Sequence, residues 1–333
     1  MRSRRMISVG SVLAVVAAAA ACGNAAPVAG ARPPPSSPAT SSQSTGAPSR
    51  PVFTVAPVPL PAPVQRAVAE EIGGVLYVAG GLDSADVSGD RVVAVDLSTG
   101  RVRVAGHMVQ PFHDAAGAVI GGQLFVFGGG TAASSDVIQS FDPATGSSRV
   151  EGRLPVALSD LSSVRVGSVV YLIGGFDGTA PQRTIYATTD GVAVRVAGEL
   201  PMGLRYPAVA ATADGRVLVA GGIGVGGATS NVYMFDPESG RVSRLGQLPR
   251  PVAHAAAFLL GATTYVAGGR DAAGDAVADV WQVTPGAGTI ESAGSLPQPV
   301  ADAAVVLVGG GVWLAGGWRG RPVADLVKAE GDP

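Results

Sequence analysis

The chain has 333 residues, of which 47% are hydrophobic and 14% are charged, and its formal net charge is −2. A chain of this length and apolar content can bury a large core, so disorder throughout is excluded. The near-balanced charge offers no basic surface, which argues against nucleic acid as a partner.

The N-terminal segment has the composition of an export signal. Three of the first five residues are arginines, and residues 6–21 are apolar or small but too few for a comfortable membrane span. Cys22, the only cysteine, follows three alanines, and this junction resembles the lipobox of bacterial lipoproteins. The resemblance implies that residues 1–21 are a signal peptide and that Cys22 carries a lipid such as palmitate at the extracytoplasmic face of the bacterial cell membrane. The alternative is an ordinary secretory signal, with Cys22 incidental.

The next segment, residues 22–50, is rich in proline, alanine, serine and threonine. Such a composition cannot form a packed core and predicts a disordered, extended tether between the lipid and a folded domain. Residues 51–333 then form that domain. Because they contain no cysteine, we expect no disulfide, cysteine-ligated metal or thiol nucleophile there.

Six nearly identical segments recur in the domain, each an apolar run that ends in a Gly-Gly pair. The first glycines of the pairs stand at positions 80, 128, 174, 221, 268 and 316, so the steps are 48, 46, 47, 47 and 48 residues. A period of about 40 to 50 residues built only of strands is typical of a β-propeller with one blade per repeat. The sequence therefore predicts an all-β fold with six blades.

Each repeat predicts four antiparallel strands, which the fourth repeat illustrates. Its first strand consists of small residues (208–211), and its second is the apolar run ending in Gly-Gly (216–222). The third carries an aromatic and branched stripe (232–235) and ends in an Asp-to-Gly hairpin turn (236–240). The fourth (241–245) alternates polar with apolar residues, as expected at an outer edge.

The two ends of the domain complement each other. Residues 325–330 look like a third strand, and no fourth strand follows before position 333. Residues 52–55 precede Leu60-Pro61, as fourth strands elsewhere precede a Leu-Pro pair such as Leu154-Pro155. We therefore expect the N-terminal strand to complete the last blade and close the ring.

These repeats resemble the kelch family, which includes galactose-oxidase-like propellers. The resemblance rests on Gly-Gly after the second strand, on an aromatic residue before it, and on Asp-Pro turns at 142–146 and 236–240. The aromatic residues are Tyr77, Phe125, Tyr171, Tyr265 and Trp313. The tryptophan usual on the fourth strand is absent. The resemblance covers roughly residues 52 to 333 and implies a six-bladed propeller.

One polar position per repeat marks a candidate site. It lies fourteen residues before each Gly-Gly pair, where the first strands begin at the mouth of the axial channel. The residues there are Arg66, Asp114, Asp160, His254 and Asp302, with Arg205 or Tyr206 in the fourth repeat; Phe176 and Trp318 would lie above them for stacking. We expect exposed rim charges that bind a sugar, a peptide or a cation. The alternative is that they cap strands and pair one blade with the next.

Other motifs carry less information. Residues 222–227 fit G-x-G-x-x-G but open no helix, so we expect no dinucleotide. The three histidines lack the spacing of metal ligands, so we expect neither a metal nor another cofactor. Arg165 and Glu71 occupy equivalent first-strand positions and could form an ion pair in the channel.

Three functions are compatible with these features. A monomeric, membrane-tethered, extracytoplasmic binding module for a protein, peptide or carbohydrate ranks first, followed by a structural cell-envelope protein. A sugar-active enzyme ranks third, because kelch-like propellers include a sugar oxidase and a sugar mutarotase. The oxidase chemistry needs a cysteine that the domain lacks, whereas mutarotase-like acid–base chemistry needs only groups such as Asp114, Asp160, Arg66 and His254. We assign no catalytic residue.

Overall fold

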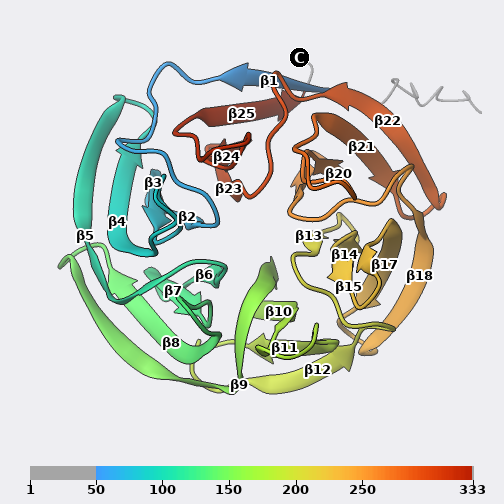
Figure 1. Ribbon diagram of the computed structural model, residues 1–333, viewed down its shortest axis with the longest axis horizontal. Coiled ribbons are helices and arrows are strands. Elements are labelled where there is room, and N and C mark those ends of the chain that lie inside the picture. The colour runs from blue at the N-terminus through green and yellow to red at the C-terminus, as the bar shows by residue number, and fades with distance from the viewer. Residues whose placement is uncertain (1–49, 332–333) are drawn as a thin grey trace, which may run out of the picture. The chain divides into compact units, whose positions relative to one another are not determined.

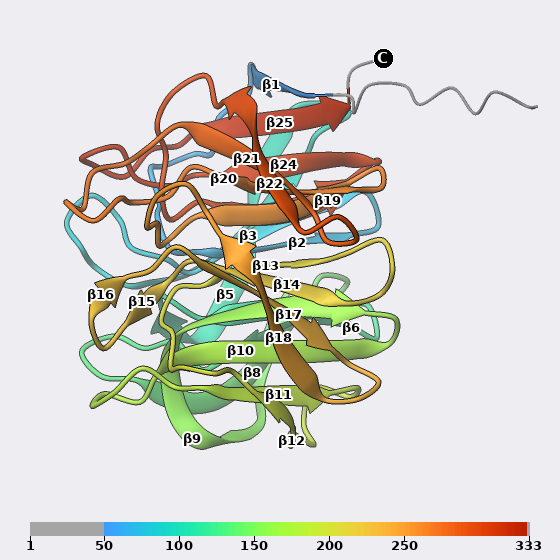
Figure 2. The same cartoon turned by 90° about the vertical axis from the view of Figure 1, so that its right-hand side faces the viewer.

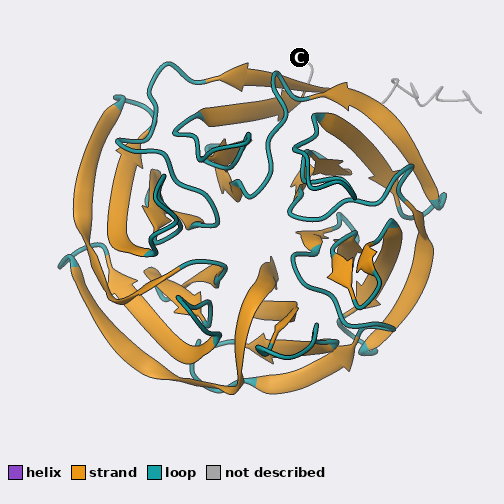
Figure 3. Ribbon diagram, in the orientation of Figure 1, coloured by secondary structure: helices purple, strands orange, loops and turns teal. Residues whose placement is uncertain are grey.

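The computed structural model describes residues 50–331, and every regular element in that range is a β-strand (Figure 3). Within it, no helix is long and apolar enough to cross a membrane. The predicted signal peptide, Cys22 and nearly all of the tether lie outside the described residues.

The strands form antiparallel sheets that stand side by side around a common centre (Figure 1). One sheet contains β2 (Val68–Ile72), β3 (Val75–Ala79), β4 (Gly89–Asp96) and β5 (Arg101–Phe112). A seven-stranded sheet contains β6 (Ala116–Ile120), β7 (Gln123–Phe127), β8 (Ser135–Asp142), β9 (Ser147–Val166), β10 (Val169–Phe176), β11 (Thr184–Thr188) and β12 (Arg195–Glu199).

Three further four-stranded sheets complete the arrangement. They contain β13 (Ala208–Ala211), β14 (Val217–Ala220), β17 (Asn231–Asp236) and β18 (Arg241–Gln247); then β19 (Ala256–Leu260), β20 (Thr263–Ala267), β21 (Asp279–Thr284) and β22 (Thr289–Ser295); and finally β23 (Ala304–Val308), β24 (Gly311–Ala315), β25 (Leu326–Gly331) and β1 (Pro51–Val55). A small hairpin of β15 (Ile223–Gly224) and β16 (Gly227–Ala228) lies at one end of the sheets, in a loop that follows a Gly-Gly pair (Figure 2).

The seven-stranded sheet arises because β9 is continuous where the sequence predicts two strands. Its first part pairs with β8 up to Leu158, and the remainder pairs with β10 from Ser159 onward. One extended segment is therefore the outermost strand of one group and the innermost strand of the next. The sequence predicts a break near Leu154-Pro155, but the backbone stays extended through it.

The predicted pairing of the N-terminal strand with the last strand is present. β1 runs antiparallel to β25, with Pro51 opposite Gly331 and Val55 opposite Val327. Phe53 on β1 also packs edge-on against Phe258, with ring centroids 6.4 Å apart. The first and last described strands thus belong to one sheet.

The core lies between neighbouring sheets. In the described chain, six clusters of buried hydrophobic side chains each join strands from two adjacent groups. In one of them, Tyr171 of β10 packs edge-on against Phe235 of β17 at 5.3 Å. The innermost strands also touch in sequence around the centre, from β2 through β6, β9, β13 and β19 to β23 and back to β2. Small residues make this approach possible.

The Gly-Gly pairs are required by the same close approach. Gly128 has φ +63°, and a Cβ atom there would lie 2.3 Å from the carbonyl oxygen of Leu158. The next residue, Gly129, donates its N–H to that carbonyl at 2.8 Å. Glycine therefore lets the chain entering the next group of strands pass directly over the end of β7.

We predict that Gly128→Ala destabilises the fold far more than Gly121→Ala. Both glycines have positive φ, which costs a side chain about 1–2 kcal/mol, but no atom lies within 4 Å of a Cβ at Gly121. The added clash with Leu158 should raise the loss at Gly128 to about 3 kcal/mol or more. Urea unfolding of the two variants measures the difference. Equal losses would show that the carbonyl contact does not matter.

Candidate functional site

Six residues at the start of the innermost strands form a cycle of backbone hydrogen bonds. Each N–H donates to the carbonyl oxygen of the preceding member, and the first donates to the last, at 2.8 to 3.3 Å. The members are Arg66, Asp114, Asp160, Tyr206, His254 and Asp302, which we call the mouth ring. The fourteen-residue spacing predicts five of them, and of the two candidates in the fourth repeat Tyr206 is the member.

Every member of the mouth ring has a left-handed backbone, with φ between 51° and 59°. Elsewhere in the described chain, Asp86 is the only non-glycine residue with positive φ. This conformation is strained for most side chains, and aspartate is among the types that tolerate it best. The recurrence of aspartate in the ring therefore has a local backbone cause as well as any role of its carboxylate.

Asp302 is the most heavily paired carboxylate of the ring. It accepts hydrogen bonds from His254 Nδ1 at 2.5 Å and from Arg270 Nη2 at 2.6 Å, and Arg66 Nε lies 3.3 Å away. Burial opposes its charge, but His254, Arg66 and Arg270 together outweigh burial and lower the pKa of Asp302 to about 2. Asp302 is thus ionised at all ordinary pH values.

Asp114 has the opposite character. Its Oδ2 accepts hydrogen bonds from Arg66 Nη1 at 3.1 Å and Tyr206 Oη at 3.0 Å, and His113 Nε2 lies 3.5 Å away. Burial is the largest influence and, with two nearby ring carboxylates, raises the pKa of Asp114 to about 7 despite Arg66. This carboxyl can therefore gain or lose a proton near neutral pH.

An arginine guanidinium group stacks on each of the two predicted stacking residues, Phe176 and Trp318. Arg205 pairs with Asp160 and lies 4.1 Å from the centroid of the Phe176 ring. Arg270 lies 3.8 Å from the Trp318 ring in the same manner. These cation–π contacts occupy one face of each aromatic ring and hold the arginines toward the carboxylates.

His254 and Tyr206 stack on each other inside the ring, with centroids 3.7 Å apart and planes at 27°. Burial lowers the pKa of His254. Because Asp302 is ionised, the Nδ1 atom of His254 that faces it carries a proton and donates it in a hydrogen bond. Burial also raises the pKa of Tyr206 above its ordinary value. Its hydroxyl is therefore a proton donor to Asp114 across the ring.

The expectation of exposed rim charges is wrong. The side chains of Asp114, Asp160 and Asp302 are only 5%, 3% and 2% exposed. Each is covered because adjacent ring members lie one backbone hydrogen bond apart, and arginines close over the carboxylates. The mouth is a charge-compensated network rather than a set of free charges.

The sequence interpretation missed Arg270, although the repeat contains the signal for it. The residue directly after each Gly-Gly pair bridges to the residue just before a ring member, as Arg270 does with Ala253 and Trp318 with Ala301. Phe176 holds the equivalent position opposite Ser159. The residue that directly follows each Gly-Gly pair therefore belongs to a second layer of side chains next to the ring, and this rule would have identified Arg270.

A cavity of about 360 Å³ opens beside the ring, which we call the loop-face cavity. Its floor includes Asp114, Asp160 and Tyr206, and Phe176 and Arg205 form one side. The loop of residues 130–134, which follows a Gly-Gly pair, forms another part of the wall. Six of the nine predicted site residues line this cavity, Arg66 among them, whereas His254, Asp302 and Trp318 do not.

Residues 50–331 contain no group of three or more histidine, cysteine or carboxylate side chains placed to hold a metal ion. The ring carboxylates bind arginine, histidine and tyrosine instead. The chemistry that this arrangement offers is proton exchange at Asp114 and hydrogen bonding at the cavity floor.

Comparison with known proteins supports a kelch-repeat β-propeller. Residues 111–155 and 204–249 match the kelch motif. The solved structure titled "Structure of YjhT" has the same fold, with a TM-score of 0.71 and 18% sequence identity over 80% of this chain and 95% of that chain. At this identity the likeness concerns the fold alone. No curated protein matches the chain.

We predict that Asp114 contributes stability that falls as the pH rises from about 4 to 7, and that Asp114→Asn removes this contribution to the slope. The pKa of Asp114 is about 7 in the folded chain and about 4 when unfolded. The stabilisation is therefore complete below pH 4 and is lost as pH rises through 7, at up to about 1.4 kcal/mol per pH unit. Glu70, whose pKa burial also raises to about 7, should preserve part of the slope.

Urea unfolding at several pH values measures this slope. Asp136→Asn, at an outer ion pair with Arg153, is the control and should leave the slope unchanged. Identical slopes for Asp114→Asn and the wild-type chain would contradict a proton held by Asp114.

Proposed function

We propose that this protein is a membrane-tethered, extracytoplasmic binding module that uses the variable-loop face of a six-bladed kelch-like propeller. The six blades follow if β9 is shared by two blades and β1 completes the blade of β23–β25. The kelch motifs support a binding or interaction module in general. The ring pairing of β1 with β25 supports closure.

The loop-face cavity is the observation that carries this proposal. Its volume of about 360 Å³ suits a small ligand or one segment of a larger one. Its floor has hydrogen-bonding groups whose charges are already paired, so it favours a neutral polar ligand over an ion. A carbohydrate or an uncharged peptide segment fits this chemistry, because Phe176 offers an apolar edge beside polar groups.

Acid–base catalysis on a sugar is the second candidate function. It is favoured by Asp114, whose pKa of about 7 suits proton transfer at neutral pH. It ranks lower because Arg66 and Tyr206 already hold the carboxylate, and its side chain is 5% exposed. A structural cell-envelope role ranks between the two, since the compensated ring would serve it equally well.

We predict that Ala132→Trp abolishes ligand binding while Ala272→Trp does not. Both alanines are exposed in loops that follow Gly-Gly pairs, but only Ala132 lines the loop-face cavity, which an indole would fill. Arrays of neutral oligosaccharides and peptides, followed by calorimetry of any hit, measure this. We expect a loss of tenfold or more in affinity. Absence of any hit, or equal binding by the two variants, would contradict the proposed site.

The anchoring part of the proposal rests on Cys22, the only cysteine, at the end of the apolar N-terminal segment. We predict that Cys22→Ala shifts the protein from the membrane to the soluble fraction, because one sulfur would carry the lipid. Fractionation and incorporation of a labelled fatty acid measure this. A wild-type chain that takes up no label, with a variant that still sediments with membranes, would overturn it.

A further inference from the structure

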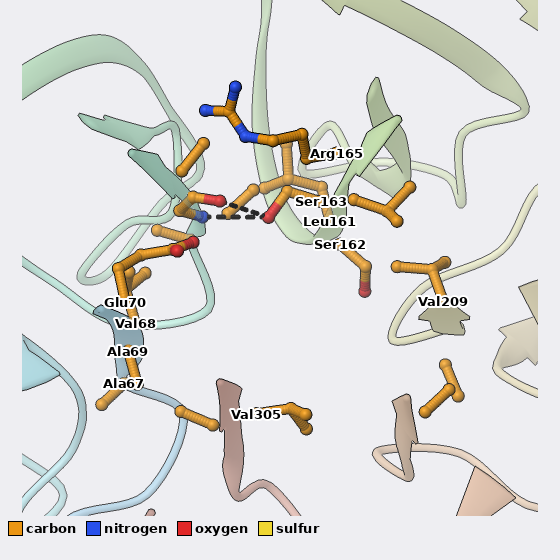
Figure 4. Close-up of a pocket in the computed structure, with 18 of the residues that line it drawn as sticks. Ala67, Val68, Ala69, Glu70, Leu161, Ser162, Ser163, Arg165, Val209 and Val305 are labelled. Atoms are coloured by element: carbon orange, nitrogen blue, oxygen red, sulfur yellow. Dashed lines mark hydrogen bonds between the residues drawn. The ribbon is translucent and has the colours of Figure 1, made fainter. Parts of the chain in front are cut away.

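A second cavity, of about 300 Å³, lies between the innermost strands (Figure 4). Its lining begins with the residues that directly follow ring members, such as Ala67 and Ala115. We call it the channel cavity. Most of its wall consists of alanine, serine and valine side chains contributed by all of the innermost strands. Two charged side chains, Glu70 of β2 and Arg165 of β9, interrupt this wall.

Glu70 and Arg165 flank the same small-residue strand, β6, from its two sides. On one side, Val68 of β2 packs against Gly117, where an added Cβ would lie 2.1 Å from Val68 Cγ1. On the other side, Ser163 of β9 accepts a hydrogen bond from Gly117 N at 3.2 Å and donates one to Gly117 O at 2.6 Å. Side chains two residues apart share a strand face. Glu70 and Arg165 therefore both face β6 and project into the cavity beside it (Figure 4).

The two charges interact but do not touch. Among residues 50–331, neither the Glu70 nor the Arg165 side chain makes a hydrogen bond, and the two side chains form no ion pair with each other. The sequence favours Glu71 as the partner of Arg165. The Glu71 carboxylate instead accepts a hydrogen bond from the N–H of Gly74 at 2.5 Å. The carboxylate and the guanidinium thus keep their hydrogen-bonding capacity open to the cavity.

We propose that the channel cavity binds a small zwitterion, such as a free amino acid with a short side chain. Its carboxylate would accept hydrogen bonds from the Arg165 guanidinium, and its ammonium group would donate to Glu70. A lone cation would pair only with Glu70 and a lone anion only with Arg165, whereas a zwitterion pairs with both groups at once. Burial makes a partner most valuable at Glu70, because the Arg165 side chain is exposed to solvent. Away from the two charges, the wall of alanine and valine offers only apolar contacts, so a short apolar side chain suits it.

Access to this site differs from access to the loop-face cavity. Glu70 and Arg165 also line a wider cavity of about 710 Å³, together with Leu259 and Leu307 near the hairpin ends of the innermost strands. The mouth ring lies at the opposite ends of those strands. A zwitterion would therefore enter from the hairpin face, independently of any ligand on the loop face.

Binding should also depend on pH, because the ammonium group requires an ionised Glu70. Burial raises the pKa of Glu70 to about 7, Arg165 opposes this rise, and Glu71 adds to it. Lowering the pH from 8 to 6 should therefore weaken binding about tenfold, in proportion to the loss of the charged form.

Isothermal titration calorimetry of the full chain tests the proposal with glycine and L-alanine as probes. Acetate and methylammonium, which each carry half of the zwitterion, are the comparison compounds. We expect binding of glycine or alanine at millimolar concentration or below and much weaker heats for the other two. Glu70→Gln and Arg165→Gln should each reduce the affinity tenfold or more. Glu238→Gln, an exposed turn residue, should leave it unchanged.

Two results would overturn the proposal. One is the absence of zwitterion binding to the wild-type chain at millimolar concentration, which needs no variant to fold. The other is binding that acetate or methylammonium matches, or that survives both Glu70→Gln and Arg165→Gln. The Ala132→Trp variant separates the two sites, because it fills the loop-face cavity and should retain the zwitterion.

Discussion

The mouth ring is the constraint on which the rest of the structure depends. Six backbone N–H groups and six carbonyl groups satisfy one another in a cycle, so each innermost strand is placed by its two neighbours. A net backbone hydrogen bond contributes about 1 kcal/mol, and a left-handed non-glycine residue costs about 1–2 kcal/mol. The two nearly offset each other. The cycle therefore sets geometry, and the hydrophobic clusters between adjacent sheets supply the stability.

That geometry explains why the two candidate sites have different chemistry. At the mouth, the cycle brings charged side chains so close that they pair with one another, as Asp302 does with Arg66 and Arg270. Further along the same strands, the side chains diverge around small residues such as Gly117. There Glu70 and Arg165 face one cavity without meeting. The charged side chains at the mouth thus pair with one another, whereas those of Glu70 and Arg165 stay open to a ligand.

Much of the fold follows from repeat spacing, because turn chemistry and close backbone approach both demand glycine at fixed positions. The Gly-Gly period predicts the strand order, the ring members and the pairing of the N-terminal strand with the last. Burial of the ring could not be predicted in the same way. The partners of Asp114 and Asp302 come from other repeats, as with Tyr206, 92 residues from Asp114. Likewise, Glu71 and Arg165 hold equivalent positions in their repeats, which favours them as partners from sequence alone. Because side chains alternate between the two faces of a strand, it is Glu70 that faces β6, as Arg165 does.

The most direct test of the ring is native-state amide hydrogen exchange resolved at its six members. If the cycle acts as one unit, the amides of Arg66, Asp114, Asp160, Tyr206, His254 and Asp302 should exchange with a common free energy, close to that of global unfolding. Opening any one hydrogen bond would then require the strands to separate together. Exchange of single members at widely different free energies, with some opening while their neighbours stay protected, would contradict a cooperative ring.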